Sequence, residues 1–173
     1  LLDAGAKAGA ILPGDGTPLI AAARGGSVEA IELLIGAGAA VNRGVDGDGN
    51  PLIAAAQEGH LDAVRVLLSR GAAIDAGVPG DGNALIMAAG AGQTEVVRLL
   101  LDQGAGTETV VPGDENALIH ASEAGAVAVV QLLVDRGANV NARVRAERAD
   151  GGAEWRTPLS MARRGGHAPV ARI

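Results

Sequence analysis

A six-residue motif that recurs every 33 residues is the feature that most constrains how this chain can fold. The copies read TPLIAA at 17–22, NPLIAA at 50–55, NALIMA at 83–88 and NALIHA at 116–121. A fifth copy, TPLSMA at 157–162, comes 41 residues after the fourth, which is eight more than the period. Repetition at a fixed period of roughly 20 to 50 residues is the signature of stacked repeat architectures. The chain should therefore consist of copies of one small unit.

Each copy predicts two short helices. Thr or Asn opens the motif as a helix cap, and Pro takes the first helical position in three copies. A second apolar run with helical spacing follows, and it ends at a glycine suited to the left-handed region: Gly38, Gly71, Gly104 or Gly137. A turn such as Pro79-Gly80, which suits a type II turn, leads to the next copy. Two such helices cannot bury their apolar faces alone, so neighbouring copies must stack into a solenoid.

The composition agrees with close stacking. Ala, Leu, Val and Ile must build the core, because the chain has no Phe, no Tyr and one Trp. Cysteine is absent, which excludes disulfides and thiolate zinc sites and is compatible with any compartment, with the cytoplasm as the default expectation. No apolar run reaches the roughly 18 residues of a membrane span.

These residues resemble the ankyrin repeat family. The resemblance lies in the 33-residue period, the Thr-Pro-Leu opening, GH at 59–60 between the helices and GANVN at 137–141 after the second helix. It implies an all-α solenoid of stacked helix-turn-helix repeats with short hairpin or turn fingers. It also implies a non-catalytic scaffold that binds a protein partner, or another domain of its parent chain, through the finger tips and the concave face of the first helices.

The repeat pattern predicts a single domain over residues 1–173. Residues 1–14 are expected to be the end of one repeat, and further repeats should start near residues 15, 48, 81 and 114. Residues 142–156 should form a lengthened finger, and residues 157–173 a partial final repeat. Neither end carries the polar face that terminal repeats present to water, so we expect the segment to come from a longer protein.

The lengthened finger holds the leading candidate contacts. Alternation of apolar and charged residues over 142–147 predicts a strand, and Asp150-Gly151-Gly152 predicts a hairpin turn. Trp and Arg are enriched at interface hot spots, and this finger and the next helix supply Trp155, Arg143, Arg145, Arg148, Arg156, Arg163 and Arg164. The alternative is that Trp155 packs against the base of the finger while the Arg side chains are solvated.

Charge is distributed unevenly along the chain. Residues 1–140 hold 7 basic and 17 acidic side chains, whereas residues 141–173 hold 7 basic and 3 acidic ones. Four carboxylates recur at 33-residue spacing and would line one edge of the stack: Asp15, Asp48, Asp81 and Asp114. They could offer an acidic strip to a basic partner, or they could satisfy the backbone of their own turns.

The sequence offers no motif for catalysis, a cofactor or a metal. Residues 46–50 read DGDGN, but a calcium loop would need Gly and a bidentate Glu where Pro51 and Gln57 stand. None of His60, His120 and His167 lies in a metal-binding or triad pattern, and His60 and His167 occupy the turn where the family has a structural hydrogen bond. Nucleic acid is a disfavoured partner, because phosphate binding needs a broad positive surface.

Two further readings remain open. The stretch EWRTPLSMARRGGH at 154–167 resembles ankyrin segments at the C-terminal end of some bacterial membrane-bound sensor peptidases. That resemblance implies a regulatory appendage, and the peptidase metal motif is absent from these residues. The other reading is a purely structural spacer.

Overall fold

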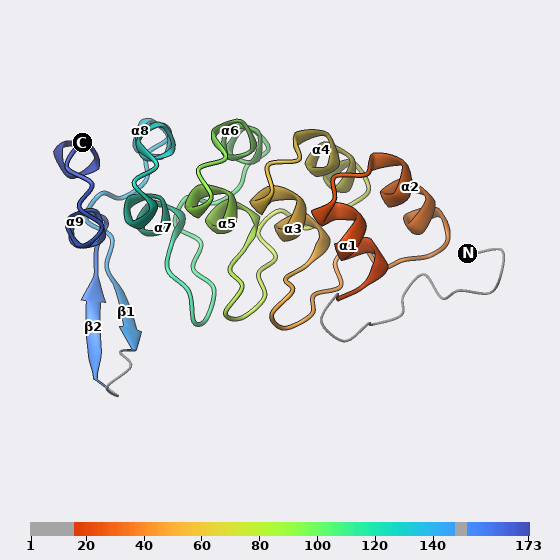
Figure 1. Ribbon diagram of the computed structural model, residues 1–173, viewed down its shortest axis with the longest axis horizontal. Coiled ribbons are helices and arrows are strands. Elements are labelled where there is room, and N and C mark those ends of the chain that lie inside the picture. The colour runs from red at the N-terminus through yellow and green to blue at the C-terminus, as the bar shows by residue number, and fades with distance from the viewer. Residues whose placement is uncertain (1–15, 148–151) are drawn as a thin grey trace.

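Five first helices form one row of the structure. The computed structural model describes residues 16–147 and 152–173. The first helices begin at each copy of the motif, and their bounds are α1 (Pro18–Arg24), α3 (Pro51–Gln57), α5 (Ala84–Gly90), α7 (Ala117–Ala124) and α9 (Pro158–Arg164). Each packs against the next first helix along the chain (Figure 1).

Second helices form a parallel row above the first (Figure 1). They are α2 (Val28–Gly36), α4 (Leu61–Ser69), α6 (Thr94–Asp102) and α8 (Val127–Asp135), and a short 3₁₀ helix, η1 (Val170–Arg172), follows α9. The final segment thus makes one 3₁₀ turn where the motif has a second helix. Within the described residues, no helix is long and apolar enough to cross a membrane. The predicted all-α solenoid of helix pairs is confirmed.

Local sequence determines where the helices start and stop. At each first helix the Thr or Asn side chain accepts a hydrogen bond from the backbone N–H three residues later, as Asn83 does from Ile86 at 2.9 Å. At the other end, Gly38, Gly71, Gly104 and Gly137 have φ values of 84° to 92°. These glycines end the second helices in the left-handed region, as predicted.

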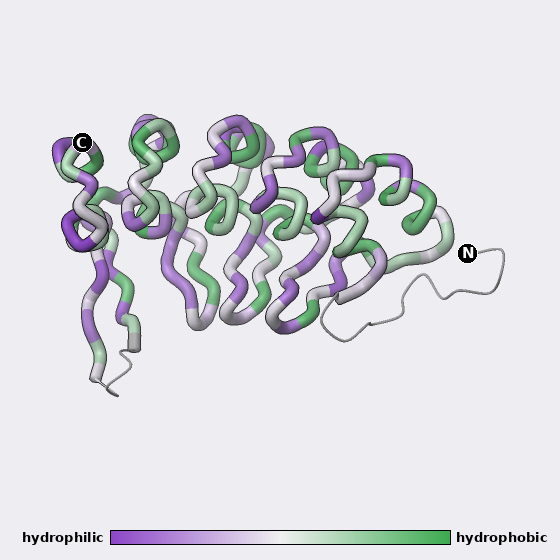
Figure 2. Tube along the Cα trace, in the orientation of Figure 1, coloured by the Kyte–Doolittle hydropathy of each residue, from purple (hydrophilic) through white to green (hydrophobic). Residues whose placement is uncertain are grey.

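The core runs through the stack between the two rows of helices. The first helices of the second and third repeats are hydrophobic along most of their length (Figure 2), and Ala55, Ala56, Ala88 and Ala89 are fully buried. Small side chains let neighbouring helices approach closely, which explains how a core forms without aromatic residues.

A ladder of hydrogen bonds joins the turns between the two helices of successive repeats. His60 Nε2 lies 2.9 Å from the carbonyl oxygen of Arg24, and His167 Nε2 lies 2.9 Å from that of Glu123. Gln93 Nε2 donates to the carbonyl oxygen of Gln57 at 3.1 Å. The structural role expected of His60 and His167 is confirmed. The equivalent residue in the fourth repeat is Ala126, whose side chain has no donor, so this junction lacks the bond.

Ala126→His is expected to raise the free energy of unfolding by about 1 kcal/mol, because it supplies the missing hydrogen bond to the third repeat. The two junctions can be compared at the glycine that faces each turn residue. A methyl group placed on Gly26 would lie 2.6 Å from the ring of His60, whereas one placed on Gly92 would lie 3.8 Å from Ala126 Cβ. The space that the His60 ring fills at its junction is therefore open beside Ala126. Urea denaturation followed by circular dichroism measures the change. His60→Ala is the matched converse and should lower stability by a similar amount; equal or lower stability of Ala126→His would contradict the account.

The lengthened finger is a two-stranded antiparallel hairpin. Strands β1 (Val144–Glu147) and β2 (Ala153–Arg156) pair with Val144 opposite Arg156 and Arg145 opposite Trp155. The hairpin projects from the helical layers on the same side as the other fingers, with β2 at the outer end of the stack (Figure 1). The predicted turn at Asp150-Gly151 and the segment expected at 1–14 lie outside the described residues.

Candidate binding surface

The second and third fingers are type II turns, which the Pro-Gly pair of the third predicts. In the second finger (45–49) and the third (78–82), the backbone N–H of the Asp donates to the carbonyl oxygen three residues earlier, at 3.0 and 2.9 Å. The central glycines, Gly47 and Gly80, both have φ of 82°. This backbone sets the direction in which each finger's aspartate projects.

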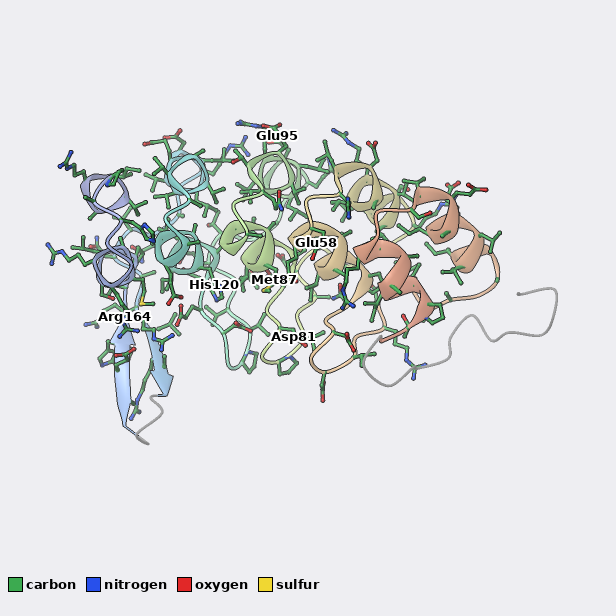
Figure 3. The ribbon with its side chains drawn as sticks, in the orientation of Figure 1. Glu58, Asp81, Met87, Glu95, His120 and Arg164 are labelled. Carbon is green, nitrogen blue, oxygen red and sulfur yellow. The ribbon has the colours of Figure 1, made fainter. Side chains whose placement is uncertain are left out.

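The aspartates join each finger to the one before it. Asp81 Oδ2 accepts hydrogen bonds from the backbone N–H groups of Gly47, at 2.7 Å, and Gly49, at 3.3 Å. Asp114 Oδ2 accepts one from Gly82 at 2.6 Å. These bonds cross between repeats, whereas the turn role considered from the sequence placed them within each turn. Asp81 therefore lies among the fingers (Figure 3) with its carboxylate occupied by the preceding repeat.

Asp48 and Asp114 have further side-chain partners. Asp48 Oδ1 accepts from Arg24 Nη2 at 3.1 Å. Asp114 Oδ1 lies 3.5 Å from His120 Nε2, and the side chains of Asp48 and Asp114 are only 15% and 11% exposed. Asp15 lies outside the described residues. The sequence-predicted acidic edge is thus largely covered by its own hydrogen bonds.

Asp81→Ala is expected to lower the free energy of unfolding by about 2 kcal/mol, because two backbone donors lose a charged acceptor. Guanidinium denaturation of the purified chain provides the measurement. Asp46→Ala is the control, because Asp46 lies at the exposed tip of the neighbouring finger. This variant removes the same charge without removing a bond between fingers. A loss that is equal for the two variants would show that net charge, rather than the bond between fingers, determines stability.

The fourth finger (111–115) has a different closure. In the second and third fingers, Gly49 and Gly82 occupy the left-handed region, and their carbonyl oxygens accept from Val45 at 2.8 Å and Val78 at 2.9 Å. The fourth finger has Glu115 at that position, and no non-glycine residue of the described chain has a positive φ. Glu115 is 5% exposed and forms an ion pair with Arg156 of the long hairpin. The Gly-to-Glu change and the lengthened finger thus form one structural unit.

The inner face of the hairpin, Val144, Ala146, Glu154 and Arg156, carries a charge network. Arg156 Nε donates to Glu154 Oε1 at 2.8 Å, and Arg164 Nη2 lies 2.8 Å from both oxygens of Glu154. Hydrogen bonds from Arg164 and then Arg156 lower the pKa of Glu154, and bonds to Glu154 and Glu115 raise that of Arg156. Arg164 lies where α9 meets the hairpin (Figure 3), so this network fixes the hairpin to the last helix.

The outward face of the hairpin carries Arg145 and Trp155, with Arg143 just before β1, and these three form no ion pair with any described side chain. Side chains alternate between the faces of a strand, so Trp155 points away from the face that carries Glu154 and Arg156. Trp155 is 61% exposed, and the Arg143 guanidinium carbon lies 5.3 Å from the centre of its ring. Trp155 therefore does not pack against the base of the finger. It forms an exposed cation–π pair, whose usual strength is about 0.5–1 kcal/mol.

The first helices form a shallow second surface. A hollow of about 310 Å³ spans the first helices of the second to fourth repeats and is lined by Gln57, Met87, Gly90, Ala91, His120, Glu123 and Ala124. Met87 and His120 lie on neighbouring first helices (Figure 3).

Arg163 is exposed on α9, and Arg148 lies outside the described residues. Sequence reasoning missed Glu115 and Glu154, although the loss of the repeating glycine at 115 marks the first of them.

No cluster of metal-ligating side chains occurs within the described part of the chain. Rows of antiparallel helix pairs with projecting fingers define a helical-repeat solenoid. The sequence matches the family described as ankyrin repeats (3 copies) over residues 1–78 and 74–144. The chain belongs to the ankyrin repeat family, whose members generally act as protein–protein interaction modules. A comparison with curated proteins gave no match.

Proposed function

We propose that this chain is a non-catalytic protein-binding module whose main contact is the outward face of the long hairpin. The observation that carries the proposal is Trp155, which is 61% exposed and stacked with Arg143. It is the most exposed large hydrophobic side chain among the described residues. A large aromatic surface held in water, with Arg beside it, is the composition of an interface hot spot.

The inner-face network supports this role by holding the hairpin in place. Arg156 connects β2 to Glu115 of the fourth finger, and Arg164 connects it to α9 through Glu154. A hairpin anchored at two points loses less conformational freedom when a partner binds, which favours affinity. Arg156 and Arg164 therefore act by positioning Trp155.

The remaining candidate contacts are secondary. Asp48, Asp81 and Asp114 each have an intramolecular partner, so a ligand would have to compete for their carboxylates. We propose Arg163, which is exposed on α9, as a contact at the edge of the surface. Arg148 belongs to the same hairpin in sequence and stays part of the proposed contact set.

Affinity capture with two baits tests the proposal. The intact chain should retain a protein partner from cells of its source, and Trp155→Ala should lose that partner while its circular dichroism spectrum stays the same. Leu33→Ala is the control, because Leu33 lies on α2, far from the hairpin, and is 58% exposed. This variant also removes a large exposed apolar side chain. Undiminished capture by Trp155→Ala would reject the hairpin as the contact, and a purely structural spacer would capture no partner even as the intact chain.

A further inference from the structure

We propose that the outward face of the hairpin recognises an acidic, extended segment of the partner protein. The inference rests on the proposed function, since it concerns the same face, and it adds the chemistry of the partner. Its basis is the way in which the hairpin sorts its charged side chains between its two faces.

The two faces differ in how their arginines are paired. On the inner face, Arg156 binds the carboxylates of Glu115 and Glu154, and Arg164 binds Glu154. On the outward face, Arg143 and Arg145 are exposed, and neither forms an ion pair or a side-chain hydrogen bond with any described residue. Guanidinium groups bind carboxylates through two parallel hydrogen bonds, so these two are open sites for an anionic partner.

Strand geometry determines the spacing that the partner must match. Arg145 lies in β1 and Arg143 precedes that strand by one residue, so at most roughly 7 Å of extended backbone separates the two positions. Carboxylates at alternate positions of an extended segment have the same spacing. Trp155, directly opposite Arg145, adds an apolar plane for the alkyl parts of that segment. The contact of Arg143 with the ring also orders this side chain before binding.

The charge of the whole chain favours an acidic protein segment over nucleic acid. Residues 1–140 carry 7 basic and 17 acidic side chains, so a long polyphosphate would meet repulsion beyond the hairpin. Phosphate backbones are bound through many contacts spread over a broad positive surface. Two guanidinium groups from positions two residues apart suit a short run of carboxylates instead.

Intrinsic fluorescence tests the inference at the site itself. Trp155 is the only Trp, and the chain has no Tyr, so its emission reports this face alone. The probe is a synthetic peptide of alternating Glu and Thr, compared with one of alternating Lys and Thr. The Glu peptide should change the emission saturably, and raising the salt to about 0.5 M should weaken binding several-fold through screening. The Lys peptide should give no saturable change.

Matched variants locate the interaction. The double variant Arg143→Ala and Arg145→Ala should bind the Glu peptide at least tenfold more weakly, with unchanged helical circular dichroism. Arg43→Ala with Arg65→Ala removes the same charge from exposed positions elsewhere and should bind normally. Equal loss in both double variants, or no response to the Glu peptide, would overturn the inference. Tighter binding of an oligothymidylate than of the Glu peptide would also overturn it. So would light scattering that shows self-association of the chain to be the cause of the emission change.

The two proposals fail in different ways. If capture of the partner requires Trp155 while the Glu peptide leaves the emission unchanged, the acidic segment is refuted and the binding surface stands. If the Glu peptide binds through Arg143 and Arg145 while capture ignores Trp155→Ala, the surface is refuted as the partner contact and its preference for carboxylates stands.

Discussion

Arg156→Met is expected to lower the free energy of unfolding by about 3 kcal/mol, because it leaves the Glu115 carboxylate buried without its positive partner. Glu115 is 5% exposed, and its Oε2 atom has no hydrogen-bond partner in the described chain. Met keeps the aliphatic length of Arg, so the variant mainly removes the charge. Denaturant unfolding followed by circular dichroism measures the loss.

A second variant distinguishes the effect of the unpaired buried charge on stability from the effect of lost packing. Adding Glu115→Gln to Arg156→Met removes the unpaired charge and should recover at least half of the lost stability. Arg163→Ala, an exposed arginine on the next helix, should change stability by less than about 0.5 kcal/mol. If the double variant is as unstable as Arg156→Met, the ion pair with Glu115 is not what holds the hairpin.

Leu85→Ala is expected to lower the free energy of unfolding by about 3 kcal/mol, because it opens a cavity between neighbouring repeats. Leu85 is 1% exposed at the third position of its motif, in the middle of the stack. Repeat units are stabilised largely by their contacts with neighbours. The lost contacts should therefore destabilise the adjoining repeats as well and shift their unfolding transition. Urea denaturation and hydrogen exchange of α3, α5 and α7 measure these effects.

The chain contains its own control for this substitution. Leu159 holds the same motif position in the last repeat and is 42% exposed on α9. Leu159→Ala should therefore lower stability by less than about 1 kcal/mol, although the residue change is identical. Equal losses at the two positions would contradict a core built from contacts between repeats.

The fold was predictable because its signals are local and repeated. The cap at Asn83, the left-handed glycine at Gly104 and the type II turn at Pro79-Gly80 each depend on a few neighbouring residues. The 33-residue period then makes each local prediction apply to every copy. The eight extra residues before the last motif likewise indicated the long hairpin, although they could not establish its register.

The candidate site was less predictable because its contacts cross between repeats. The hydrogen bonds from Gly47 and Gly49 to Asp81 span 34 and 32 positions, and the pair between Arg156 and Glu115 spans 41. The sequence pattern left the Asp series between an acidic strip and bonds within each turn, and it did not distinguish the arginines of the hairpin from one another. Only the strand register separates Arg156, which is paired, from Arg143 and Arg145, which are free of pairing among the described residues.

Shortening the long finger tests the central claim most directly. Replacing residues 142–156 with the shorter connection that precedes the fourth repeat would remove Trp155 and its neighbouring arginines from the stack. The affinity of the captured partner, measured by calorimetry, should fall by at least tenfold, while the helical signal of the remaining repeats persists. Unchanged affinity in a folded variant would contradict the account, because the helices and short fingers would then suffice for binding.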